Sequence, residues 1–239
     1  MARRRRRGGR GPRPAGGPSA PGSAVAEIAS AGASLAPSNG GAPATGRVAR
    51  VERRTRETEV LLQLNVDGRG DMAIDTTIPF FNHMLEAAGK HGLLDLRVSA
   101  RGDTDVDLHH TVEDVGICLG KAFHEALGDK RGIVRFGTSY VPMDEALASV
   151  HVDISGRPYF SYNVPFTKTR VGTFDLDLLK DFFRAFAMNA MLNLHVNLQY
   201  GENLHHIAEA LFKAFGRALA EASRLNPRIE GVLSTKGAL

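Results

Sequence analysis

The chain has 239 residues and a formal net charge of +4, which is unevenly distributed. Residues 1–47 carry eight arginines and one acid, Glu27, hence +7, so the remaining residues carry about −3. This acidic remainder argues against a nucleic-acid partner, and no run approaches the roughly 20 apolar residues of a membrane span. The single cysteine, Cys118, excludes an intramolecular disulfide and fits a reducing compartment.

The amino-terminal segment, residues 1–46, consists mainly of Gly, Ala, Pro and Ser with an arginine run at 3–7. Such a segment cannot bury enough apolar surface to offset its ordering entropy, so we predict that it is disordered. Three interpretations stay open: a contact with polyanions, an organelle transit peptide, or an unconserved or mis-assigned extension, which we favour. We predict a cytoplasmic location, with a plastid as the alternative if the segment is a transit peptide.

Residues 47–132 are predicted to form a first half-domain. Alternation of apolar and polar residues indicates strands, and Asp67 to Gly70 indicates a turn. Pro79 suits the first turn of a helix, which is expected to end near Gly92. The predicted elements are strands at 47–56, 58–66 and 93–100 and helices at 79–92 and 109–127.

Residues 133–239 are predicted to form a second half-domain with the same mixture of elements. The expected strands are 134–142, 145–154, 158–163 and 192–199, and the expected helices are 175–190 and 204–223. Short connections between mixed elements favour two α+β layers, a sheet with helices on one face. The fold class predicted from these elements is therefore α+β.

A pentapeptide with two histidines and a glutamate occurs twice. His109-His110-Thr111-Val112-Glu113 recurs 96 residues later as His205-His206-Ile207-Ala208-Glu209. On a helix, Glu113 shares a face with both histidines of its motif. The two histidines diverge by about 100° around the axis, so one ion does not readily collect both. Each helix is predicted to supply two separate ions, and the two helices together a dinuclear or paired-metal arrangement.

The repetition extends upstream of both motifs. His83 precedes His109 by 26 residues and Asp181 precedes His205 by 24, so superposing the copies places Asp181 where the first copy has His83. Alone, His83 is more typical of a packed core histidine and Asp181 of a solvated acid, but the repeat favours both as ligands. We expect a pseudo-twofold axis between the copies, with the starts of the two motif helices on one rim.

The two copies together offer eight candidate ligands for two ions. Imidazole with carboxylate suits zinc, iron, manganese and similar ions. Four protein ligands leave two positions of a six-coordinate ion open, and a closed structural zinc site would normally use thiolates. The predicted site is therefore catalytic, and its candidate ligands are His83, His109, His110, Glu113, Asp181, His205, His206 and Glu209.

Basic and hydroxyl side chains at predicted turns and element ends indicate that the site also binds an anionic group. Guanidinium groups bind phosphate in bidentate fashion, and a Ser-Thr-Lys-Gly turn adds hydroxyl, backbone N–H and ammonium donors. Each alone is more typical of an ordinary surface residue, but together with open metal positions they predict a small phosphorylated substrate. These residues are Arg135, Arg157, Lys213 and Ser234-Thr235-Lys236-Gly237.

Several motifs, in this order and spacing, are those of one enzyme family. They are Phe81-Asn82-His83-Met84-Leu85, His109-His110-Thr111-Val112-Glu113-Asp114, Gly132-Ile133-Val134-Arg135-Phe136-Gly137, Ser155-Gly156-Arg157-Pro158, His205-His206-Ile207-Ala208-Glu209-Ala210 and Ser234-Thr235-Lys236-Gly237. From about Arg47 to Leu239, the chain resembles the imidazoleglycerol-phosphate dehydratases, lyases of histidine biosynthesis.

This resemblance implies duplicated half-domains of the ribosomal-protein-S5-domain-2-like fold. It also implies two Mn²⁺ ions per active site, and a homo-oligomer of twenty-four subunits with active sites shared across interfaces. The metal ligands carry over to seven of the positions above. The eighth, a histidine in some members, falls at Asp181, and this departure bears on the affinity of one metal site.

The reaction implied is the dehydration of imidazole glycerol phosphate to imidazole acetol phosphate. Metal coordination would stabilise an imidazolate ring, the ring would expel a hydroxyl to give a diazafulvene, and a carboxylate would take the acidified proton. We predict Glu57, Glu209 and His110 as catalytic residues. Substrate contacts are expected at His91, Arg135, Arg157, Lys213, Ser234 and Lys236, in addition to Glu57.

Two other classes of protein stay open from the residues alone. A carboxylate-bridged di-iron or metal-storage bundle also uses Glu and His at i+3, but the strand-rich regions 47–66 and 134–163 argue against a bundle. An RNA-binding module would fit the basic tail, but the acidic remainder and its lack of clustered exposed aromatics argue against it.

Overall fold

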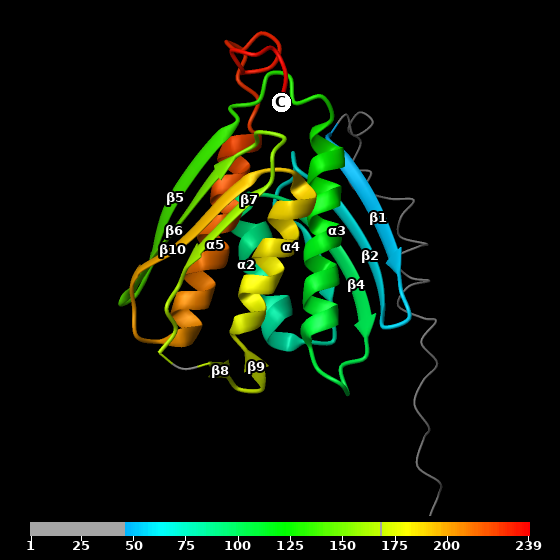
Figure 1. Cartoon of the computed structure of the whole chain (residues 1–239), viewed down its shortest axis with the longest axis vertical. Coiled ribbons are helices and arrows are strands. Elements are labelled where there is room, and N and C mark those ends of the chain that lie inside the picture. Colours follow the sequence, from blue (N-terminus) through cyan, green and yellow to red (C-terminus); the bar gives the residue numbers. More distant parts are fainter. Residues whose placement is uncertain (1–45, 168) are drawn as a thin grey trace, which may run out of the picture.

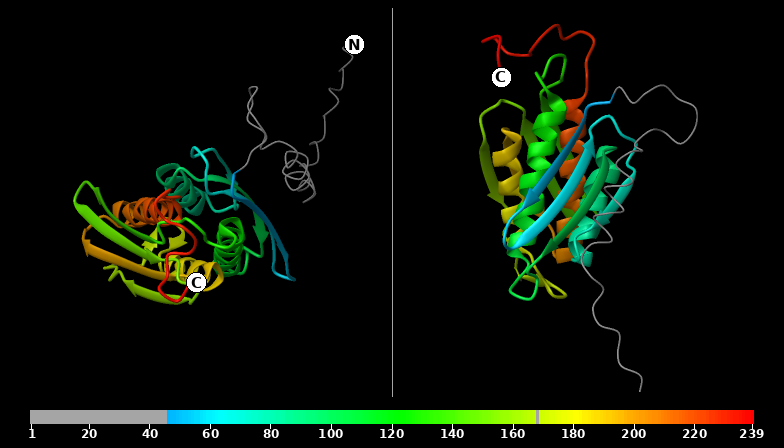
Figure 2. Two further views of the ribbon diagram at one scale, coloured as in Figure 1. Left: turned by 90° about the horizontal axis from the view of Figure 1, so that it is seen from above. Right: turned by 90° about the vertical axis from the view of Figure 1, so that its right-hand side faces the viewer.

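The computed structural model describes residues 46–167 and 169–239. Within them, two four-stranded sheets lie on the outside and four helices lie between the sheets (Figures 1 and 2). The predicted disorder of the amino-terminal segment concerns residues that lie, except for Gly46, outside the described ones. None of the described helices is long and apolar enough to cross a membrane.

Each half-domain contains four strands and two helices in the same order. The first consists of β1 (Val48–Arg54), β2 (Thr58–Asn65), β3 (Met72–Asp75), α2 (Pro79–Gly92), β4 (Asp95–Gly102) and α3 (His109–Leu127). The second consists of β5 (Phe136–Met143), β6 (Ala146–Asp153), β7 (Tyr159–Asn163), α4 (Asp177–Ala190), β10 (Asn193–Tyr200) and α5 (Leu204–Ser223), with a small hairpin of β8 (Arg170–Val171) and β9 (Phe174–Asp175) inserted before α4.

The sheet topology confirms the duplication. The strand orders β1-β2-β4-β3 and β5-β6-β10-β7 are the same when the elements are matched in chain order. In both sheets the last pair is parallel and the other two pairs are antiparallel. Strands β2 and β6 even share the burial pattern along their eight residues. The fold is therefore α+β, with two copies of one half-domain.

Most predicted elements are confirmed to within three residues at their ends, and helices 109–127 and 204–223 agree at both ends. Strand β3 was missed because its four residues are half-buried or exposed and lack a buried apolar pair. The predicted arrangement was a sheet with helices on one face. Each half has such a sheet, and every strand pairs only with strands of its own half.

Local capping explains where several helices begin and end. Pro79 opens α2, where a missing N–H costs nothing. Asn203 caps α5 by accepting hydrogen bonds from the backbone N–H groups of His205 and His206. Helices α2 and α4 both end in a left-handed residue, Leu93 and Met191, so the repeat preserves an unusual cap without glycine.

The helices pack across the two halves: α2 lies against α5, and α3 lies against α4. Glycine permits this approach, because a Cβ on Gly216 of α5 would lie 2.0 Å from the carbonyl oxygen of Ala88 in α2. Similarly, a Cβ on Gly120 of α3 would lie 2.5 Å from the carbonyl oxygen of Phe186 in α4. Buried phenylalanines fill the space around these crossings; they are Phe81, Phe123, Phe182, Phe183, Phe186, Phe212 and Phe215.

Replacing Gly216 with Ala is expected to lower stability, since the methyl group has no room and α2 must move away from α5. Overpacking of a core typically costs about 1–3 kcal/mol, and contact with a backbone carbonyl places this site at the upper end. For a chain of this size each 1 kcal/mol lowers Tm by about 2–4 °C. Thermal unfolding measures the effect, and an unchanged Tm would show that the crossing is not tight.

Candidate active site

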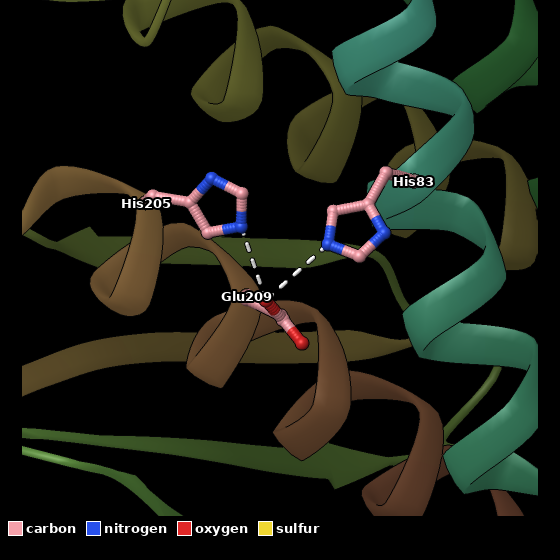
Figure 3. Close-up of side chains that lie close together, drawn as sticks. All are labelled: His83, His205 and Glu209. Atoms are coloured by element: carbon pink, nitrogen blue, oxygen red, sulfur yellow. Dashed lines mark hydrogen bonds and ion pairs between the residues drawn. The ribbon is translucent and has the colours of Figure 1, made fainter.

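One cluster of potential metal ligands joins the two half-domains. His83 of α2 and His205 of α5 direct their Nε2 atoms at the same oxygen, Oε2 of Glu209, over 3.3 Å and 3.2 Å (Figure 3). The three ligand atoms lie within 4.8 Å of one another. Two imidazole nitrogens and a carboxylate oxygen at this spacing suit a divalent first-row metal.

Glu209 is held as an anion in this cluster. Its side chain is only 12% exposed, and Lys213, one turn further along α5, lies 2.8 Å from its other oxygen. Burial on its own would raise the pKa of Glu209, but hydrogen bonds with Lys213 and His83 outweigh it and keep the pKa below its usual range. A charged carboxylate fixed by three partners is suited to metal coordination.

A second cluster lies at the equivalent place between α3 and α4. Asp181 is the fifth residue of α4, as His83 is of α2, and its Oδ2 lies 3.3 Å from His109 Nδ1. Glu113 lies 3.7 Å from the other ring nitrogen of His109. These carboxylates therefore approach different nitrogens, so among the described residues only the His83 cluster has three convergent ligand atoms. Asp181 nevertheless occupies the position that the repeat predicts.

The second histidine of each motif points away from these clusters. The Nδ1 of His110 lies 3.1 Å from both carboxylate oxygens of Asp103, while Glu57 lies 3.8 Å from its Nε2. The Nδ1 of His206 lies 2.7 Å from Glu145 Oε2. The predicted divergence of neighbouring histidines is thus present, and each outward histidine has a carboxylate at Nδ1.

These carboxylates favour the charged form of the outward histidines. The hydrogen bond with Asp103 raises the pKa of His110, and the hydrogen bond with Glu145 raises the pKa of His206. The same bond lowers the pKa of Glu145 to about 2. Sequence reasoning missed Asp103 and Glu145. For Glu145 the signal was its repeat register, since it directly precedes β6 as Glu57 directly precedes β2.

The four described helices, α2 to α5, begin at the same end of the molecule, the lower end in Figure 1, so the motif helices share a rim as expected. The two clusters, however, belong to different helix pairs. One lies between α2 and α5, and the other lies between α3 and α4. Within one chain, the two motifs therefore do not form a single dinuclear centre.

Of the residues predicted to bind phosphate, all but Lys213 lie close to the ends of the helices, toward the carboxyl terminus of the chain, which Figure 1 shows at the top. The backbone N–H of Arg135 bonds to Ala222 O near the end of α5, and its guanidinium bonds to Asp153 and to Leu233 O. Arg157 lies in the turn between β6 and β7, and its carbonyl accepts a hydrogen bond from the side chain of Asn193, the first residue of β10. Ser234 helps to line a hollow beside Arg135, and its hydroxyl accepts the backbone N–H of Lys236.

His91 lies between these two ends, near the end of α2. Its pKa is lowered by partial burial and by the positive charges of Lys213 and Arg217. It lines a separate hollow with Ser139, Arg217 and others. Of the predicted substrate contacts, Lys213 and Glu57 lie near the histidine clusters, whereas Arg135, Arg157, Ser234 and Lys236 do not.

The arrangement is that of an enzyme built from a duplicated α+β half-domain, with histidine and carboxylate clusters at one end and basic residues at the other. The family model of imidazoleglycerol-phosphate dehydratase matches residues 76–219. The imidazoleglycerol-phosphate dehydratases of Trichlorobacter lovleyi and Alkaliphilus metalliredigens are each 58% identical, over 81% and 80% of this chain and 99% and 97% of theirs.

Solved structures of the same enzyme agree. The dehydratase of Staphylococcus aureus has a TM-score of 0.68 and 43% identity, covering 75% of this chain and 99% of its own. That of Pyrococcus furiosus, solved in complex with (S)-C348, has a TM-score of 0.69 and 37% identity, covering 79% and 100%. The chain belongs to the imidazoleglycerol-phosphate dehydratase family and is a hydro-lyase, which implies a role in histidine biosynthesis.

Proposed function

We propose that this chain dehydrates imidazole glycerol phosphate to imidazole acetol phosphate with the help of bound divalent metal, predicted to be manganese. The observation that carries this proposal is the convergence of His83, His205 and Glu209 on one point between α2 and α5. Because the ligands come from both half-domains, the cluster forms only when the two copies of the repeat pack together.

The donor set fits such an ion. His83, His205 and Glu209 would hold one ion, and His109, Glu113 and Asp181 would hold a second. His110 and His206 point away from both clusters and are therefore available to ions of another copy. When bound, the metal supplies Lewis-acid stabilisation of negative charge on the imidazole ring of the substrate.

Of the two carboxylates predicted to move protons, Glu57 is better placed. Its side chain is 56% exposed, and its Oε2 lies 3.8 Å from Nε2 of His110. Glu209 is 12% exposed and already engaged by His83, His205 and Lys213. We therefore assign the removal of the substrate C–H proton to Glu57.

The separation of the two ends supports an active site shared between subunits. Arg135 contacts Ala222, 17 residues along α5 from His205, which at 1.5 Å per residue is about 25 Å. A three-carbon chain between an imidazole ring and a phosphate cannot span that distance. Phosphate contacts and metal ligands of one active site would thus come from different copies, as in the twenty-four-subunit homo-oligomer we predict.

The competing functions fit less well. A four-helix di-iron bundle has no place for two four-stranded sheets. A role in binding nucleic acid would rest on the amino-terminal arginines, which lie outside the described residues. The cytoplasmic location and the plastid alternative stay predictions.

Metal removal tests the proposal. Chelation is expected to abolish turnover of imidazole glycerol phosphate, because Lewis-acid stabilisation contributes several kcal/mol and each 1.36 kcal/mol is a factor of ten, so the loss should exceed about a thousandfold. Addition of Mn²⁺ should restore it. Full turnover by protein shown by elemental analysis to hold no transition metal would contradict the proposed chemistry.

A further inference from the structure

Glu57 and Glu145 occupy equivalent positions in the two half-domains. Glu57 directly precedes β2 and Glu145 directly precedes β6, and these strands have equal length and the same burial pattern. Each glutamate faces the second histidine of the motif in its own half. Their contacts nevertheless differ, and this difference indicates different roles.

Glu145 lies in the β5–β6 turn, and both of its carboxylate oxygens have partners at or just before the start of α5. Its Oε1 accepts hydrogen bonds from the backbone N–H groups of Asn203 and Glu202, over 2.7 Å and 3.3 Å. Its Oε2 lies 2.7 Å from Nδ1 of His206. The carboxylate thus ties the β5–β6 turn to the start of α5. It leaves Nε2 of His206 for a further partner, with only the exposed carboxylate of Asp144 nearby, at 3.7 Å.

In the first half-domain, Asp103 has this position instead. Both of its oxygens lie 3.1 Å from Nδ1 of His110, and Glu57 lies on the Nε2 side of the ring. The corresponding residue after β10 is Gly201, where a Cβ would lie 2.8 Å from Ile207 and 2.9 Å from Ala146. No side chain fits there, so an aspartate equivalent to Asp103 is excluded in the second half-domain.

We propose that Glu145 is a positioning residue that keeps the proton of His206 on Nδ1 and its Nε2 free to bind metal. Asp103 does this for His110, and Glu57 is thereby left free for proton transfer. The two equivalent glutamates have therefore diverged, one to orient a ligand and the other to act on substrate. This inference rests on the proposed function, because it assigns Nε2 of His206 to a metal ion.

Glu145→Gln tests the proposal with little change in shape. Since Oε1 is tied to two backbone donors, the amide nitrogen of Gln must take the place of Oε2 and donate to Nδ1. The proton of His206 then moves to Nε2, which removes the lone pair that binds metal. In metal-free protein with ¹⁵N-labelled histidine, solid-state NMR should show this change of tautomer, with His206→Gln identifying the signal.

Mn²⁺ affinity gives the second measurement. Loss of a carboxylate that orients a ligating histidine typically weakens metal binding about 10- to 100-fold, and we expect this for Glu145→Gln, with kcat recovering at saturating Mn²⁺. Glu202→Gln is the matched control. It removes one charge from the neighbouring residue, whose side chain makes no hydrogen bond or ion pair with the described residues, and should leave both measurements unchanged.

The outcomes separate the two proposals. An unchanged His206 tautomer in Glu145→Gln would overturn the role of Glu145, as would a kcat that stays low at saturating Mn²⁺ with unaltered affinity. If the unaltered protein bound no Mn²⁺, the proposed metal site itself would be overturned. The first failure is read from metal-free protein and the second from the unaltered protein.

Discussion

Assembling the Arg135→Ala and His205→Ala variants together is expected to restore dehydration that neither variant supports alone. Arg135 and His205 lie at opposite ends of the helix layer, so in the proposed assembly one active site combines the predicted phosphate-binding end of one copy with the histidine cluster of another. In a mixed oligomer some sites receive an intact Arg135 from one copy and an intact His205 from the next.

The expected sizes are large. Removing His205 takes away a ligand of the proposed metal, whose contribution of several kcal/mol corresponds to a loss of about a thousandfold or more. In a head-to-tail contact each site needs an intact Arg135 from one copy and an intact His205 from another. In an equal random mixture each of these is present in half of the copies, so about a quarter of the sites should be complete. Co-expression of differently tagged variants followed by turnover measurements checks this.

A second mixture provides the control. Arg135 and Arg157 lie at the same end of the molecule, so every site built from Arg135→Ala and Arg157→Ala copies lacks one of them. This mixture should not exceed the activity of its components. If the first mixture also stayed inactive although both tags were present in one oligomer, each active site would have to be built within a single chain.

Glu57→Gln is expected to lower kcat by about 100- to 10,000-fold, the usual contribution of a general acid or base. The glutamine preserves the shape of the side chain but cannot take a proton. Because Glu57 belongs to neither histidine cluster, bound metal should stay at the level of the unaltered protein. Steady-state kinetics together with elemental analysis separates these two effects.

Glu59→Gln is the matched control for that variant. Glu59 lies two residues further along the same hairpin, where it pairs with Arg54 on the surface. The glutamine at this position removes the same charge without changing the surroundings of His110, so kcat should change little. A Glu57→Gln variant with normal kcat would transfer the proton role to another group, and one that had lost its metal would make Glu57 part of the metal site.

Much of this molecule follows from short-range patterns in its sequence. Hydrophobic periodicity placed both motif helices, 109–127 and 204–223, at their observed ends, since their apolar faces are long and regular. The recurring motif predicted the duplication, and the equal sheet orders confirm it. The matched positions of His83 and Asp181 were also predictable, because a repeat preserves the place of a residue within its helix.

The partners of those residues were decided only by the tertiary structure. His83 meets Glu209 of the other half-domain because α2 packs on α5, and glycines such as Gly216 allow that approach. The proposed role of Glu145 depends on a turn lying against the start of a helix 58 residues away. Long-range packing, rather than local propensity, sets these contacts, and it also separates the end predicted to bind phosphate from the histidine clusters by the length of α5.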